Sequence, residues 1–217
     1  MSLFGFLTNV FYHESSTIGF NDFELAKLKL DLVSIICYLV AAPLPEPVLS
    51  EGLRTIANLS RGKQVAKHIC SVGFGEGLVA LLNHESKSAV FYALGCLVNI
   101  SNERLFYEKQ TDVELLGYLS TAEMCGHELL ELALQVFCNM LSFYKREGVD
   151  INHSKDHKEI PQVLQRLKAS AVNENSKTEA ADQRGQLASM IEYAERALED
   201  DKFETTPMKL NELLIDR

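Results

Sequence analysis

The sequence predicts an all-α protein in which short helical units repeat and stack into a curved rod. Three blocks support this fold class, LRTIANLS at 53–60, LGCLVNIS at 94–101 and LQVFCNML at 134–141. Their asparagines, Asn58, Asn99 and Asn139, are 41 and 40 residues apart. A fixed period of this length is typical of solenoid proteins, whose repeats each contact only their neighbours. We therefore expect about three full repeats, with partial repeats at the ends.

Each block is predicted to be the last helix of its repeat. The fifth residue before each asparagine is leucine and the sixth is small, while apolar residues stand two before and one after it. These offsets follow one face of a helix, and the small residues allow neighbouring helices to approach closely. The leucines are Leu53, Leu94 and Leu134, and the small residues are Gly52, Ala93 and Ala133.

Two further helices are expected before each marked helix. Apolar runs form the second helix and shorter segments form the first, with a glycine-rich turn between them, so a repeat holds three helices in about 40 residues. The second helices are expected at 33–39, 78–82 and 115–119, the first at 64–71 and 103–110, and the turn at 73–77.

The sequence is predicted to divide into four segments, of which the terminal ones extend the repeat pattern. Residues 1–14 fit the asparagine columns through Phe4, Leu7 and Asn9, which predicts the third helix of a truncated repeat. Repeats then occupy 20–145. Residues 146–200 are expected to form a degenerate capping repeat, with helices around 160–171 and 187–198, because no asparagine marks the last one. An acidic tail, 201–217, ends in the short amphipathic sequence LNELLI.

These features resemble the armadillo repeat family. The resemblance rests on the L-x-x-[LI]-x-N-[LI] signature of the third helix, the glycine-containing turn before L-V-x-L-L, and the 40-residue period. LRTIANLS is especially similar to the catenin type of third helix. Membership would imply a right-handed α-α superhelix.

The resemblance also implies a role for the recurrent asparagine. In peptide-binding armadillo proteins this residue faces a concave groove, and an amide offers one acceptor and two donors to the backbone of an extended peptide. Asn9, Asn58, Asn99 and Asn139 are the corresponding candidates. The alternative is that each amide bonds within its own repeat and links helix to loop.

The residue that stands four positions before each asparagine would determine which peptide sequences bind. Nuclear import receptors of the alpha type carry Trp there, whereas this sequence has Gly5, Arg54, Gly95 and Gln135. A basic nuclear-import peptide is therefore a poor candidate ligand. Arg54, with Arg61 and Lys63 nearby, would suit an acidic ligand, although these residues could also be ordinary solvated charges. Arg54 and Gln135 complete the predicted peptide-binding set.

The composition of the chain excludes some classes of binding partner and indicates the cellular compartment. With 30 acidic against 21 basic residues, the formal charge of −9 provides no basic field for nucleic acid. The apolar run 32–45 is too short to cross a bilayer, and the N-terminus lacks the basic region and cleavage site of a signal peptide. Five cysteines without a C-x-x-C pattern indicate a reducing compartment. We expect a cytoplasmic protein without a membrane or small-molecule partner.

No pattern for catalysis, a metal or a cofactor stands out. Gly73, Gly75 and Gly77 lack the spacing and the preceding strand of a nucleotide fingerprint. The pairs Cys125 with His127 and His68 with Cys70 each offer two ligands, whereas zinc needs three or four. His153 and His157 lack a third partner, and no nucleophile motif occurs. A non-enzymatic function is expected.

Two functional hypotheses remain. The first is a scaffold or adaptor that binds an extended segment of a partner protein along the asparagine-lined groove. The run EGLRTIANLSRGKQVAKHI is similar to an armadillo protein whose role concerns building cilia and flagella, which would make this an assembly or transport adaptor there. The second is a structural component docked into a large complex through its ends and convex face. Apolar Phe4, Phe6, Leu7 and Phe11 also predict self-association through the N-terminal helix.

Overall fold

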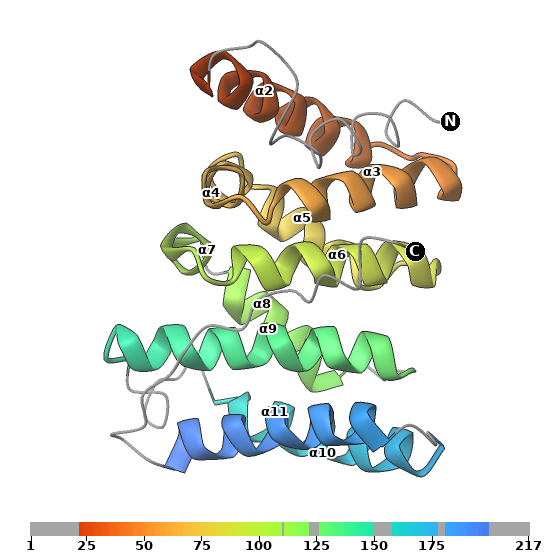
Figure 1. Cartoon of the computed structure of the whole chain (residues 1–217), viewed down its shortest axis with the longest axis vertical. Helices are drawn as coiled ribbons and strands as arrows, with labels where there is room; N and C mark the ends of the chain where they lie inside the picture. The colour runs from red at the N-terminus through yellow and green to blue at the C-terminus, as the bar shows by residue number, and fades with distance from the viewer. Residues whose placement is uncertain (1–21, 110, 122–125, 150–157, 178–180, 200–217) are drawn as a thin grey trace. The chain divides into compact units, whose positions relative to one another are not determined.

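All regular structure in the described part of the chain is helical (Figure 1). The computed structural model describes residues 22–109, 111–121, 126–149, 158–177 and 181–199. The predicted all-α fold class is confirmed there. The helices are α2 (Asp22–Val40), α3 (Glu46–Leu59), α4 (Lys63–Ser71), α5 (Phe74–Leu81), α6 (Lys87–Ile100), α7 (Arg104–Glu108), α8 (Thr111–Thr121), α9 (His127–Arg146), α10 (Ile160–Lys177) and α11 (Ala181–Glu199).

These helices form two compact units. The first contains α2 to α7 and the second contains α8 to α11. The third helices predicted for the three full repeats are present, with Asn58 on α3, Asn99 on α6 and Asn139 on α9. The predicted boundaries at 20–145 and 146–200 follow sequence repeats and stay predictions. The segments 1–14 and 201–217 lie outside the described residues.

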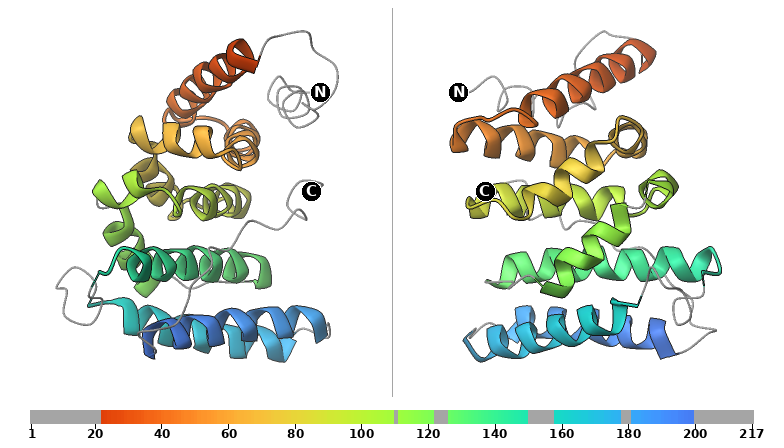
Figure 2. Two further views of the ribbon diagram at one scale, coloured as in Figure 1. Left: turned by 60° about the vertical axis from the view of Figure 1, so that its left-hand side comes forward. Right: turned by 180° about the vertical axis from the view of Figure 1, so that it is seen from behind.

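The first unit shows the stacking expected of a solenoid. Helix α3 packs along α6, and α2 packs on α3 in the way that α5 packs on α6. The short helix α4 connects these layers, since it contacts α2, α5, α6 and α7. Figures 1 and 2 show α3 and α6 side by side, with α4 and α7 near one end of each. Equivalent residues of α3 and α6 therefore lie on neighbouring helices.

Apolar residues at the predicted columns form the core of this unit. Leu53 and Ile56 of α3, and Leu94 and Leu97 of α6, are fully buried. Their spacing of three residues places each pair on one helix face, where they fill the contact between the two helices. The columns read from the sequence are thus core positions.

Two details differ from the sequence prediction. The helix expected at 33–39 is longer than predicted, because residues 22–40 form one continuous helix. The predicted turn 73–77 is also wrong in its extent, because only Gly73 has a left-handed backbone, with φ of 77°, and α5 begins at Phe74. Burial of Phe74, which is 7% exposed, offsets the low helix propensity of the following glycines.

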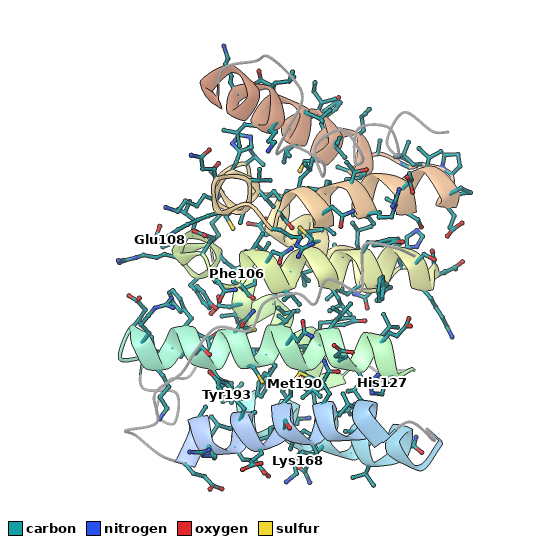
Figure 3. All side chains as sticks on the ribbon, viewed as in Figure 1. Phe106, Glu108, His127, Lys168, Met190 and Tyr193 are labelled. Atoms are coloured by element: carbon teal, nitrogen blue, oxygen red, sulfur yellow. The ribbon has the colours of Figure 1, made fainter. Side chains whose placement is uncertain are left out.

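The second unit pairs α9 with α11. Helix α10 contacts α8, α9 and α11, so the four helices share one core. Figure 3 shows Met190 and Tyr193 of α11 directed toward α9. Hydrogen bonds join α9 and α11: Gln186 Nε2 donates to Glu131 Oε1, Cys138 Sγ donates to the Met190 carbonyl, and the hydroxyls of Ser142 and Tyr193 share one.

Candidate protein-binding site

A polar stripe follows one face of α3. Glu51, Arg54 and Asn58 are spaced at i, i+3 and i+7, and all three are partly exposed among buried neighbours. On α6, Tyr92 and Asn99 occupy the positions equivalent to Glu51 and Asn58, and both are also partly exposed. We call these five residues the α3–α6 stripe. Because α3 packs along α6, the stripe crosses two neighbouring helices of the same unit.

Arg54 is paired within its own helix. Its Nη2 lies 2.5 Å from Glu51 Oε1 and its Nε donates to Glu51 Oε2 at 3.0 Å. The hydrogen bond to Glu51 raises the pKa of Arg54, against the opposing effect of burial. The side chains are 18% and 25% exposed. Because Glu51 compensates the guanidinium charge, Arg54 offers an acidic ligand less than the sequence suggested.

Tyr92 brings α6 into this charged pair. Burial raises the pKa of the Tyr92 phenol, while the Arg54 charge lowers it and the Glu51 charge raises it. The charges of Arg54 and Glu51 on α3 thus both act on the phenol of α6. The ring also packs edge-on against Phe91, with centroids 5.3 Å apart. The phenol is therefore a partly exposed polar group of α6 that responds to the charges on α3.

Asn99 uses its amide inside the protein. Its Nδ2 donates to the Ala57 carbonyl at 3.1 Å and to Ser60 Oγ at 2.8 Å, both at the end of α3. The Ser60 hydroxyl in turn donates to the same carbonyl at 2.8 Å. The amide therefore ties one marked helix to the one before it, which is a bond between neighbouring repeats and differs from the predicted bond within one repeat.

Asn58 has the same register but a different environment. Its Nδ2 is shielded from solvent and has no hydrogen-bond acceptor among the described residues. Burying such a donor without a partner costs roughly 1–3 kcal/mol. The side chain as a whole remains partly exposed. Asn58 thus holds an unused donor just beneath the partly exposed stripe, and an added carbonyl could accept from it once the amide turns outward.

The corresponding residues of α9 are buried. Asn139 is 0% exposed and Gln135 is 3% exposed. Gln135 Nε2 donates to Glu131 Oε1 at 3.0 Å, an atom that also accepts from Gln186 of α11, whereas Gln135 Oε1 has no described partner. The assignment of Asn139 and Gln135 as peptide contacts stays a prediction, and their burial leaves little surface for a ligand.

Other predicted residues fall elsewhere. Asn9, Cys125, His153 and His157 lie outside the described residues. His68 shares a 2.6 Å hydrogen bond with Ser34 and so joins α4 to α2. In the part of the chain that the structure describes, no three His, Cys, Asp or Glu side chains gather where they could hold a metal ion. None of the described helices is long and apolar enough to span a membrane.

Sequence reasoning missed three residues of this region. Glu51 and Tyr92 each stand seven residues before the asparagine of their helix. One is acidic and the other aromatic, so this position showed no common residue type. Ser60 follows Asn58 by two, and Ser101 stands in the same place after Asn99. That recurrence was the available signal for an internal role of the amides.

Comparison with known proteins gives likenesses of structure alone. No protein-family model and no curated protein sequence matches the chain. Among solved structures, an engineered protein is 17% identical with a TM-score of 0.47, and the match covers 93% of this chain and 99% of that one. A designed armadillo repeat protein in complex with the peptide (KR)4 is 15% identical, with a TM-score of 0.46 over 90% of this chain and 99% of that one. A computationally designed armadillo repeat protein for modular peptide recognition is 14% identical, with a TM-score of 0.43 over 80% of this chain and 94% of that one.

Proposed function

We propose that this chain is a non-enzymatic scaffold of armadillo type that binds an extended segment of a partner protein along the α3–α6 stripe. The unpaired Nδ2 of Asn58 is the observation that carries this proposal. A peptide carbonyl that met this amide, turned outward, would remove the cost of a buried donor without an acceptor. An extended chain presents such a carbonyl every few ångström.

The charge of the stripe favours contacts with the peptide backbone over contacts with a charged side chain. Arg54 and Glu51 compensate each other, and the remaining members are two amides and a phenol. Groups of this kind accept from and donate to N–H and C=O groups of any sequence. A neutral segment is therefore the expected ligand, in place of the acidic ligand that Arg54, Arg61 and Lys63 suggested.

The asparagines divide between two roles in this proposal. Asn58 contacts the partner, and Asn99 holds α6 on α3 through Ala57 and Ser60. Asn9, Asn139, Gln135 and Arg54 remain predicted contacts. A function in the assembly or transport of cilia and flagella rests on the sequence resemblance of residues 51–69 and remains part of the proposal.

A selection from a random peptide library tests this function. Peptides would be selected on the full chain and their affinities measured for Asn58→Ala and for the control Ser88→Ala, an exposed residue of α6. Loss of one hydrogen bond predicts about a five- to tenfold weaker affinity for Asn58→Ala. Its melting temperature should not fall, because the donor has no described internal partner.

Two outcomes would count against the proposal. One is a set of selected peptides that bind Asn58→Ala as tightly as the parent chain. The other is a loss of stability in Asn58→Ala with unchanged peptide binding, which would favour a structural component without a peptide groove.

A further inference from the structure

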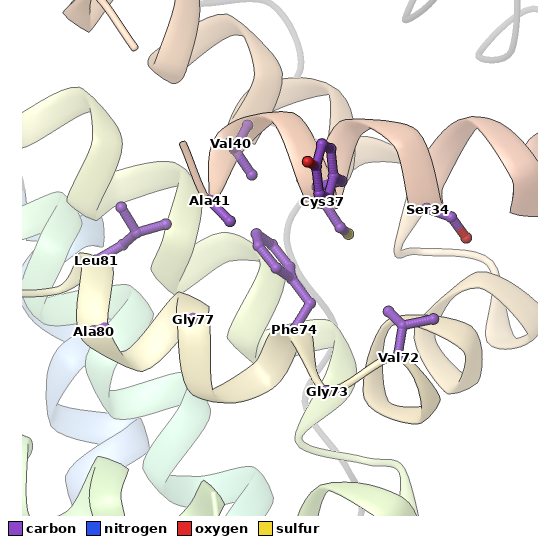
Figure 4. A pocket seen from close by; sticks show the side chains of 11 residues that line it. Ser34, Cys37, Val40, Ala41, Val72, Gly73, Phe74, Gly77, Ala80 and Leu81 are labelled. Atoms are coloured by element: carbon purple, nitrogen blue, oxygen red, sulfur yellow. The ribbon is translucent and has the colours of Figure 1, made fainter. Parts of the chain in front are cut away.

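A groove separates α2 from α5 within the first unit. Helix α2 packs on α3 in the way that α5 packs on α6, and α3 packs along α6. Between α2 and α5 there is an open space of about 610 Å³, which Figure 4 shows in close-up. The residues that line it do not include those of the α3–α6 stripe, so the groove is a separate feature of the same unit.

Small side chains on both walls give the groove its depth. Ala41 of α2 lines it together with Gly77 and Ala80 of α5, and Phe74 supplies an aromatic ring at the start of α5. Packed helices approach to about 8–10 Å when their side chains fill the contact. Walls with so little bulk leave this contact unfilled, and the space accepts apolar side chains from a third element.

The serine hydroxyl in the groove is already used. Among the lining residues, Ser34 donates from its hydroxyl to the Leu30 carbonyl at 3.0 Å. The same oxygen shares a 2.6 Å hydrogen bond with His68 of α4. Since this hydroxyl is committed within the unit, the contacts of an occupant inside the groove are apolar.

Apolar surface extends beyond the groove itself. Tyr38 is 81% exposed and Val72 is 47% exposed, and both line the groove. Ile35 and Leu39, on the same helix as Tyr38, are 56% and 39% exposed and do not line it. Exposed apolar surface that is larger than one cavity is typical of a protein interaction site. It favours a protein segment over a small molecule as the occupant.

The walls favour a helical occupant over an extended one. The backbone N–H and C=O groups of α2 and α5 bond within their own helices, so an extended segment would leave its own groups unpaired there. A helix pairs these groups internally. Helix α5 has 8 residues, which at about 1.5 Å per residue gives a wall of about 12 Å. The occupant therefore presents about two turns, with apolar side chains at i, i+3 or i+4, and i+7.

The α4 side of the groove is basic. Lys109 Nζ lies 3.6 Å from where a Cβ on Gly73 would be, and Gly73 is part of the groove wall. Lys67 is exposed on α4, and neither lysine forms an ion pair with a described residue. The exposed acidic neighbour on α5 is Glu76. Two cations beside one carboxylate favour an occupant with acidic residues at this end.

We propose that the groove between α2 and α5 binds an acidic amphipathic helix of a partner protein. The apolar face of that helix fills the space over Gly77 and Ala80 and covers Tyr38. Its carboxylates lie beside Lys109 and Lys67. This interaction surface is independent of the peptide contacts proposed for the α3–α6 stripe.

A library of displayed helical peptides tests the proposal on the full chain. Each peptide spans about four turns, carries leucine, isoleucine, methionine or phenylalanine at i, i+3 and i+7, and has random polar residues elsewhere. Enriched peptides are synthesised with a fluorescent label, and their affinities are measured by fluorescence anisotropy. Acidic residues should be enriched over basic ones at the random positions.

A substitution in the wall locates the binding. Ala80 is exposed in the free chain, so Ala80→Glu should leave the melting temperature unchanged. The enriched peptides should bind this variant at least about tenfold more weakly, because a carboxylate would be buried against their apolar face. Ser88→Glu, at an exposed position of α6 outside the groove, is the matched control and should bind them with the parental affinity.

Charge reversal tests the acidic character of the partner. Lys109→Glu should weaken the binding of the acidic peptides about threefold, as expected for one exposed ion pair. Peptides whose carboxylates are changed to lysine should instead bind Lys109→Glu more tightly than the parent chain. Lys87→Glu, at an exposed lysine at the start of α6 and outside the groove, is the control for this arm and should change nothing.

The stripe and the groove can fail separately. Asn58→Ala should bind the helical peptides with the parental affinity, since Asn58 does not line the groove. A failure of the peptide contacts proposed for the stripe therefore leaves this inference standing, and the reverse also holds.

The inference is overturned if no helical peptide is enriched, if Ala80→Glu binds the enriched peptides as tightly as the parent chain, or if Lys109→Glu leaves their affinity unchanged. Light scattering tests for a second copy of this chain as the occupant. A dimer of the parent chain that Ala80→Glu dissociates would assign the groove to that copy and would equally overturn it.

Discussion

At the scale of the residue, identical side chains in equivalent positions have different partners. Asn58 and Asn99 stand at equivalent positions after the repeated leucines, yet among the described residues only Asn99 has the end of a preceding helix within reach of its Nδ2. An amide forms a hydrogen bond wherever an acceptor lies close enough. The sequence determines where the asparagine stands on its helix, and the neighbouring helix determines whether its amide finds an acceptor.

Replacement of Asn99 should lower stability. Asn99→Ala removes both hydrogen bonds to the end of α3 and leaves the Ala57 carbonyl and Ser60 hydroxyl with fewer partners. We expect a loss of about 1–3 kcal/mol in the free energy of unfolding. Urea denaturation would measure it, with Asn58→Ala as the matched control. Equal losses in the two variants would contradict the division of roles.

At the scale of the element, the start of α6 is fixed by a serine that contacts two helices. Ser86 Oγ accepts from the Ala89 N–H and donates to Glu46 Oε1 of α3 at 2.7 Å. Glu46 also accepts from Ser50 Oγ at 3.2 Å. A helix cap therefore doubles as a link between stacked helices, at the end opposite to Asn99.

Loss of this cap should destabilise α6. For Ser86→Ala we expect about 1 kcal/mol lower stability, since the first turn of the helix loses a side-chain acceptor. Ser88→Ala, two residues later on the exposed surface, should be neutral or slightly stabilising because alanine favours a helix. Thermal unfolding of the two variants measures the difference. A similar melting temperature for both would show that the cap contributes nothing.

At the scale of the whole molecule, the four cysteines that the structure describes belong to the apolar interior of the two units. Burial raises the pKa of Cys37, Cys70 and Cys138 to about 12, and it also raises that of Cys96. The ordinary thiol value is about 8.5. The described thiols are therefore protonated and unreactive in the folded chain, as expected of small core residues.

Stability should consequently fall at alkaline pH. Above about pH 8.5 the unfolded chain releases thiol protons that the folded chain retains up to about pH 12, so the free energy of unfolding decreases as pH rises. Raised pKa values of Tyr92 and Tyr118 act in the same direction, and the lowered pKa of Lys29 opposes it. Urea denaturation at pH 8 and pH 10 measures the slope.

A variant without two of these thiols provides the control. Cys37→Ala with Cys138→Ala should show a shallower decrease between pH 8 and pH 10, whatever its stability at pH 8. A parental stability that stays constant or rises over this interval would show that the buried thiols do not govern the alkaline response.

The sequence by itself determined the all-helical fold class and the position of the repeated helices, because a 40-residue period and a helical apolar pattern are local properties. It also pointed to Asn58 and Arg54. Only the tertiary structure decided that Asn99 bonds to α3, that Glu51 compensates Arg54, and that Asn139 and Gln135 are buried. Those outcomes depend on which atoms of neighbouring helices come within hydrogen-bond distance, which spacing along the chain does not specify.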